Sequence, residues 1–72
     1  MKRNINEILK QAENTNDLKT LINLWNEIAN NKYNYSLVSI RFAREQIMNL
    51  SLKSDGSDID KGKFYTFLND QR

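Results

Sequence analysis

Apolar side chains recur at helical spacing near the start of the chain. Within residues 4–13, an i, i+3, i+4, i+7 pattern places four of them on one face of a helix: Ile5, Ile8, Leu9 and Ala12. Asn4 precedes this stripe and is expected to cap the helix, with Glu7 at the third helical position in capping-box spacing. A helix this short is marginal alone in water, so we expect its apolar face to pack against another element.

A second stretch with the same spacing follows a cluster of cap-forming residues at 14–17. Its apolar positions are Leu18, Leu21, Ile22, Trp25, Ile28 and Ala29. Placed at 100° per residue, these side chains and Leu24 fill an arc of roughly 160°. A face this wide contacts more than one neighbouring helix, and Trp25 at its centre is predicted to lie in the core.

The segment from Ser36 to about Lys53 is the longest predicted helix, and it carries apolar residues on two faces. Ser36 is the expected N-cap, because Tyr35 before it and Ile40 after it have the spacing of a hydrophobic staple. One face consists of Ile40, Ala43, Ile47 and Leu50, and the second consists of Leu37, Met48 and Leu52 together with Arg41 and Arg44. A helix that is apolar on two sides is central in a bundle or uses one side for a partner.

A β-strand is an alternative prediction for residues 38–42. Their sequence, Val-Ser-Ile-Arg-Phe, alternates apolar and polar side chains and is rich in strand-forming residues. A lone strand needs a partner for its backbone hydrogen bonds, and only residues 64–68 could supply one. We therefore favour the helix.

The last segment predicts a short helix over about residues 60–70, because Phe64, Phe67 and Leu68 keep helical spacing. Three residues suit its N-cap: Ser57, Asp58 and Asp60. Gly62 weakens its first turn by about 1 kcal/mol relative to alanine. The predicted fold class is all-α, a small bundle of three to four short helices in a single domain of residues 1–72.

The composition lacks residue types on which most catalytic mechanisms depend. The 72 residues include no cysteine and no histidine, which excludes disulfides and thiolates and removes the commonest general base and zinc ligand. The carboxylates lie on polar faces, where nothing is expected to raise their pKa toward neutrality. We expect no enzymatic activity and no cofactor.

The aspartates at 55, 58 and 60 are the nearest approach to a metal site, and their spacing does not fit calcium binding. In EF-hand register from Asp58, Gly62 falls where an oxygen ligand is needed and Asn69 falls where a bidentate glutamate is needed. Capping of the last helix explains the same carboxylates. We therefore expect no metal.

The sequence also indicates the cellular compartment in which we expect the protein. No run approaches the ~18 apolar residues of a transmembrane helix. Lys2 and Arg3 are followed by polar residues and not by the apolar region of a signal peptide. We expect a cytoplasmic protein without membrane contact.

Nucleic-acid binding is a second functional class that the charge distribution keeps open. The net charge is +2, and residues 32–54 alone carry +3. The cations of this segment are Lys32, Arg41, Arg44 and Lys53, with Tyr33 beside the first. Such a basic strip with adjacent aromatics could contact phosphates, although the footprint is light. Arg41 and Glu45 at i, i+4 fit an ordinary surface ion pair equally well.

The second face of the third helix is the leading candidate site. Arginine, methionine and leucine together are typical of protein-binding surfaces, because arginine stems cover apolar area and methionine adapts its shape. With an aromatic from the preceding loop, the predicted binding residues are Leu37, Arg41, Arg44, Met48, Leu52 and Tyr33. The structural alternative is that the first or last helix covers this face, with both arginines reaching past it to solvent.

The sequence thus predicts a small protein-binding module, either a regulatory adaptor or a minor component of a larger assembly. Its expected partner is another protein or a second copy of itself. Eleven asparagines and seven lysines without proline, histidine or cysteine resemble the coding bias of AT-rich genomes. By that association alone, we expect a viral or mobile-element source.

Overall fold

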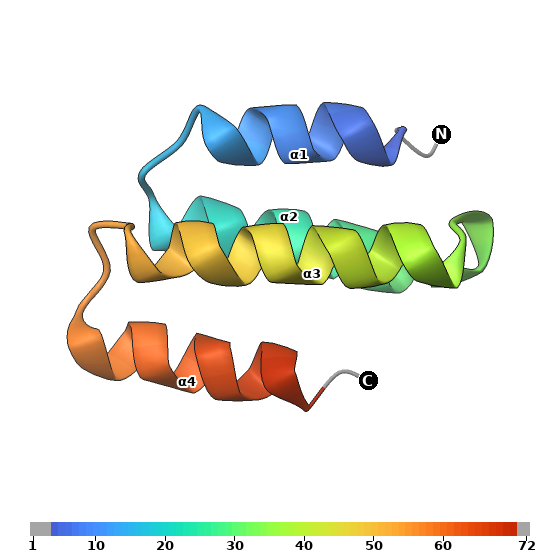
Figure 1. The fold of residues 1–72 in the computed structure, drawn as a ribbon. Helices are drawn as coiled ribbons and strands as arrows, with labels where there is room; N and C mark the ends of the chain where they lie inside the picture. The colour runs from blue at the N-terminus through green and yellow to red at the C-terminus, as the bar shows by residue number, and fades with distance from the viewer. Residues whose placement is uncertain (1–3, 71–72) are drawn as a thin grey trace.

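The computed structural model describes residues 4–70 and shows four α-helices joined by short connections (Figure 1). The helices are α1 (Ile5–Glu13), α2 (Leu18–Asn30), α3 (Leu37–Leu52) and α4 (Asp58–Asn69), with the 3-10 turn η1 (Lys32–Asn34) between α2 and α3. This arrangement confirms the predicted all-α class. Lys2 and Arg3, which bear on the signal-peptide prediction, lie outside the described residues.

Side-chain caps determine where three of the four helices begin. In each, the side-chain oxygen of the cap accepts a hydrogen bond of 2.8 to 3.2 Å from a backbone N–H in the first turn. The three pairs are Asn4 with Asn6, Ser36 with Ser39, and Ser57 with Asp60. The predicted caps Asn4 and Ser36 are confirmed. Ser57 is the cap among the three candidates, and α4 therefore begins two residues earlier than predicted.

The strand interpretation of residues 38–42 is wrong, because they lie inside one continuous helix. The N–H of Ile40 donates to the Ser36 carbonyl oxygen at 3.0 Å, as in a first helical turn. The backbone groups of this segment are therefore satisfied locally and need no partner strand.

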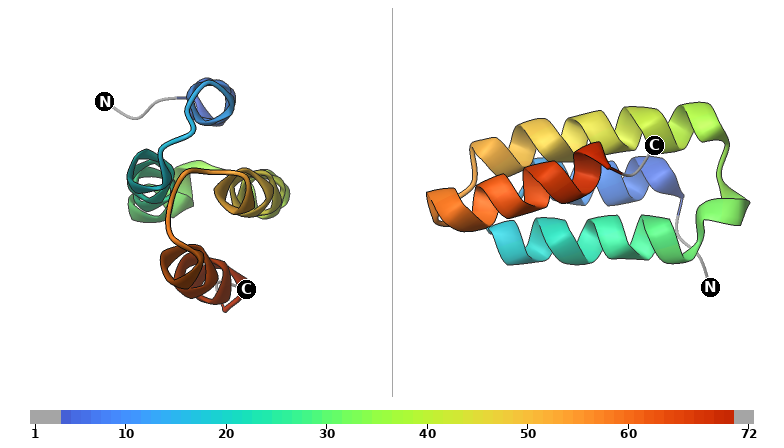
Figure 2. Two further views of the ribbon diagram at one scale, coloured as in Figure 1. Left: turned by 90° about the vertical axis from the view of Figure 1, so that its left-hand side faces the viewer. Right: turned by 90° about the horizontal axis from the view of Figure 1, so that it is seen from below.

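Helix α3 is the central helix of the bundle. It packs against α1, α2 and α4, and α1 also packs against α2. The end-on view in Figure 2 shows α2 and α3 side by side, with α1 over both of them and α4 on the opposite side. Within the described residues α4 packs mainly on α3, so α2 and α4 flank a space that neither helix fills.

The core lies between α1, α2 and α3, and α4 adds two side chains to it. Its buried apolar residues are Ile8, Leu9, Ala12, Leu18, Leu21, Leu24, Trp25, Ile28, Ala43, Ile47, Phe64 and Leu68. Trp25 is 2% exposed, which confirms its predicted place in the core. Ala43 and Ser51 are fully buried on α3, and their small size lets neighbouring helices approach it closely.

In the range 4–70, the helices are too short or too polar for any of them to cross a bilayer.

Candidate protein-binding surfaces

The six predicted binding residues do not share one environment. Tyr33, Leu37 and Leu52 are 93%, 74% and 50% exposed. Arg41 is also exposed, whereas Arg44 and Met48 are half-buried. The structure therefore splits the predicted face along the length of α3.

Helix α4 accounts for part of this split, because it packs on α3 and its Tyr65 lies beside Met48. Met48 packs against the buried core. Tyr65 of α4 lies with Met48, Glu45 and Asn49 around a small hollow of about 160 Å³. The alternative that another helix covers this face thus holds for the part near Met48, and the N-terminal part of α3 stays open.

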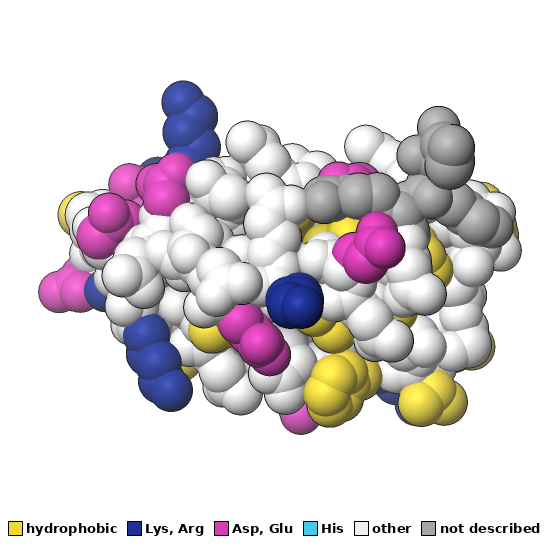
Figure 3. Space-filling view, turned by 90° about the horizontal axis from the view of Figure 1, so that it is seen from above, with side chains coloured by type: hydrophobic (Ala, Val, Ile, Leu, Met, Phe, Trp, Pro, Cys, Tyr) yellow, Lys and Arg dark blue, Asp and Glu magenta, His cyan; other side chains and the backbone are white. Residues whose placement is uncertain are grey.

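Two exposed apolar residues on α3 were not among the predicted binding residues. Val38 is 76% exposed and Phe42 is 57% exposed, and both lie beside Leu37 and Arg41 in the first two turns. We call these four residues the α3 ridge. Figure 3 shows hydrophobic side chains protruding at the lower right edge, over the N-terminal half of α3. The available signal was the i, i+4 spacing of Val38 and Phe42 outside both apolar faces.

The cations of residues 32–54 do not form one continuous exposed strip. The ammonium group of Lys32 lies over the ring of Tyr33, 5.3 Å from its centroid, near the start of α3. Lys53 follows the other end of α3, about 18 Å along the helix axis from Arg41. Arg44, between them in sequence, is half-buried. Nucleic-acid binding stays a prediction, and this separation gives it no added support.

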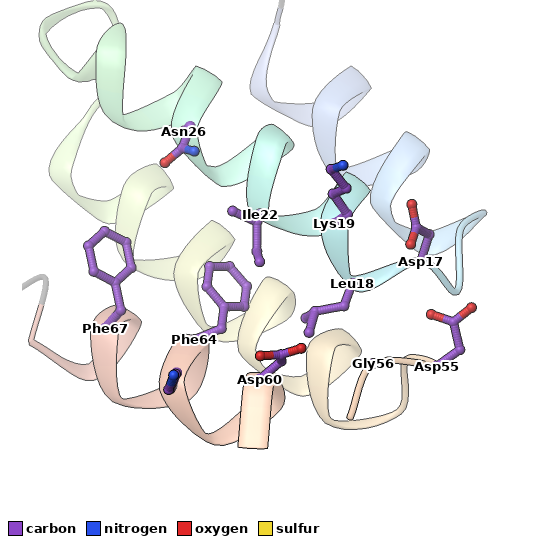
Figure 4. Close-up of a pocket in the computed structure, with 11 residues that line it drawn as sticks. Asp17, Leu18, Lys19, Ile22, Asn26, Asp55, Gly56, Asp60, Phe64 and Phe67 are labelled. Carbon is purple, nitrogen blue, oxygen red and sulfur yellow. The ribbon is translucent and has the colours of Figure 1, made fainter. Parts of the chain in front are cut away.

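A second surface is the groove between α2 and α4, with a volume of about 640 Å³ (Figure 4). Its apolar lining comes from Leu18 and Ile22 of α2 and from Phe64 and Phe67 of α4. Each of these residues belongs to a predicted helical stripe, but the groove itself results from the placement of α4 on α3 away from α2. The sequence reasoning did not find it.

The two phenylalanines of α4 differ in burial: one packs into the core, and the other lies exposed at the groove. The Phe64 and Phe67 rings are stacked, with centroids 6.4 Å apart and an interplanar angle of 17°. Phe64 is 5% exposed and holds α4 on the core, whereas Phe67 is 46% exposed and leaves much of its ring open at the groove. The groove therefore offers aromatic area to an occupant at little structural cost.

One end of the groove is closed where two loops meet. The N–H of Asp55, in the α3–α4 loop, donates to the carbonyl oxygen of Asn16, in the α1–α2 loop, at 2.8 Å. Asp17 and Asp55 stand at this end in Figure 4, and Asp60 stands on the α4 side. The groove is thus apolar along its walls and bordered by carboxylates.

The polar residues of the groove also include two cations and an amide, from Lys19, Lys63 and Asn26. The three carboxylates of the lining do not converge as metal ligands: within residues 4–70 no three acidic, histidine or cysteine side chains form a group able to hold a metal ion. The lining as a whole carries one more negative than positive group.

Comparisons with protein-family models, with curated proteins and with solved structures found no match to this chain. The ridge is exposed and apolar and carries one arginine, whereas the groove is apolar and bordered by three carboxylates and two lysines.

Proposed function

We propose that this chain is a small protein-binding module that docks through the α3 ridge. The observation that supports this is the exposure of three large apolar side chains, Leu37, Val38 and Phe42, at 57% to 76% within two helical turns. A chain this short needs most of its apolar groups for its own core. A contiguous apolar patch left outside the core is typical of an interaction site.

The chemistry of the ridge suits a protein partner. Phenylalanine and arginine are enriched at protein interfaces, and the stem of Arg41 can cover apolar area while its guanidinium contacts charges at the rim. Leu52 extends the exposed side of α3, about 22 Å along the axis from Leu37, and Tyr33 adds an aromatic before the helix. The partner is expected to present an apolar surface with acidic groups at its edge.

The setting that fits this activity is a regulatory adaptor or a minor component of a larger assembly. The composition favours a viral or mobile-element source for such a component, as set out above. A cytoplasmic location belongs to the same proposal.

The test compares two double variants of α3 with matched charge changes. Val38→Asp with Arg41→Glu alters the ridge, and Asn49→Asp with Lys53→Glu makes the same net change near the other end of the helix; all four residues are exposed. Untagged protein is co-purified from its native source, and circular dichroism checks that both variants are folded. We expect the ridge variant to lose its partner and the control to keep it. Retention of every partner and of the oligomeric state by the ridge variant would refute the proposal.

A further inference from the structure

We infer that the partner of the α3 ridge is a second copy of this chain, which receives the ridge in its α2–α4 groove. This inference rests on the proposed function, because it takes the ridge as the docking element. It adds the identity of the partner and assigns a role to the groove.

The two surfaces are complementary in shape. Val38 and Phe42 lie at i, i+4 on the outer side of α3, the spacing with which an amphipathic helix presents anchors to a hydrophobic groove. The groove supplies apolar walls from two helices, and the exposed edge of Phe67 lies in one of them. Contact between the two would bury apolar side chains that the monomer leaves in water.

The two surfaces are also complementary in charge. The first two turns of α3 hold one charged residue, Arg41, and Lys32 precedes the helix. The nearest acidic residue on α3, Glu45, follows one turn after Arg41. The groove of the receiving copy carries three carboxylates, Asp17, Asp55 and Asp60, against two lysines. A guanidinium entering beside those carboxylates gains charge-assisted hydrogen bonds and fixes the orientation of the docked helix.

The position of the two surfaces determines the kind of assembly. The ridge lies at the N-terminal end of α3, next to η1, whereas the groove reaches the opposite end of the bundle, where the α1–α2 and α3–α4 loops meet (Figures 1 and 4). The contact therefore joins two different patches, and each copy that uses one patch still offers the other. Such a contact builds an open chain or a ring of copies, the smallest ring being two copies that exchange ridge and groove.

The experiment uses three variants of the full chain and the native protein. The ridge variant is Val38→Asp with Arg41→Glu. The groove variant is Asp55→Lys with Phe67→Lys. The control variant, Thr66→Lys with Asp70→Lys, matches the charge change of the groove variant at exposed residues outside the groove lining.

Sedimentation velocity is measured from about 1 µM to 1 mM, the range over which weak contacts dissociate. We expect the native chain and the control variant to form concentration-dependent species of two or more copies. The ridge and groove variants should each stay monomeric. Their equimolar mixture should form a one-to-one dimer and nothing larger. Each pair of chains then has one intact ridge, on the groove variant, and one intact groove, on the ridge variant.

Three results would overturn the inference. These are a native chain that stays monomeric throughout, a mixture that stays monomeric although the native chain assembles, and native assembly that the groove variant leaves unchanged. The proposed function fails separately, through the co-purification experiment. If the native chain is monomeric, and the ridge variant but not its control fails to co-purify with a different protein, docking through the ridge stands. The second copy is then excluded as the partner.

Discussion

Gly56, in the loop before α4, lies directly against the side chain of Leu18 at the start of α2. A Cβ atom added to Gly56 would lie 2.9 Å from the Leu18 Cβ and closer still to its Cδ2. The absence of a side chain at position 56 thus allows the α3–α4 loop to approach α2. Together with the Asp55 to Asn16 hydrogen bond, this contact closes one end of the groove.

Gly56→Ala is predicted to destabilise the fold by about 1–3 kcal/mol, the range for overpacking a tight contact. Leu18 is 5% exposed and has little room to move away from a new methyl group. Urea denaturation followed by circular dichroism measures the change in the free energy of unfolding. An unchanged unfolding midpoint would show that the loop can shift without cost.

Gly62→Ala is predicted to have the opposite effect and to stabilise the protein by about 1 kcal/mol. Gly62 lies inside α4, and a Cβ atom there would meet nothing within 4 Å. Alanine loses less conformational entropy than glycine in a helix, so the gain comes from the unfolded chain. The same urea titration provides the measurement, and a destabilised Gly62→Ala protein would argue against the observed position of α4.

Ile47→Ala is predicted to destabilise the protein by about 2–5 kcal/mol, because it leaves a cavity in the core. Ile47 is fully buried on α3, the helix against which the other three pack. Leu52→Ala on the same helix is the control: Leu52 is 50% exposed, and its truncation should change stability by no more than about 0.5 kcal/mol. Thermal melts of the two variants test the difference, and equal melting temperatures would contradict the central position of α3.

Ser36→Ala is predicted to destabilise the protein by about 1 kcal/mol, whereas Ser36→Gly should cost only a few tenths. The Ser36 hydroxyl oxygen accepts a hydrogen bond from the Ser39 N–H at 3.1 Å, which satisfies a free amide of the first turn of α3. Since Leu37 and Val38 occupy that turn, fraying there should also reduce docking through the ridge. Amide exchange of the first turn of α3 measures the fraying, and unchanged exchange in Ser36→Ala would contradict the capping role of Ser36.

Helix positions could be predicted from the sequence because their signals are local. The stripe of α1 and the caps Asn4 and Ser36 depend on residues within a few positions of one another, and the structure shows each of them. The start of α4 has no single local signal. Three neighbouring residues suit its N-cap, and in the structure the Ser57 side chain accepts the hydrogen bond from the Asp60 N–H.

The surfaces could be predicted only in part, because they depend on how helices distant in sequence pack together. Leu37 and Arg41 were proposed from the spacing on α3 and are exposed. The spacing of Val38 and Phe42 sets them apart from both apolar faces, but no pattern on α3 indicates that α4 covers the side of Met48. The groove has no local signal, because Ile22 and Phe67 belong to different helices whose separation is a property of the whole fold.

The docking of α4 mainly on α3 also has a dynamic consequence. Helix α4 buries Phe64 and Leu68, whereas α2 buries five side chains. Elements with few buried contacts open locally at a lower free energy than the global unfolding. The groove exists only while α4 is docked, so an occupant that bridges α2 and α4 would slow amide exchange throughout α4 and couple the order of this helix to assembly.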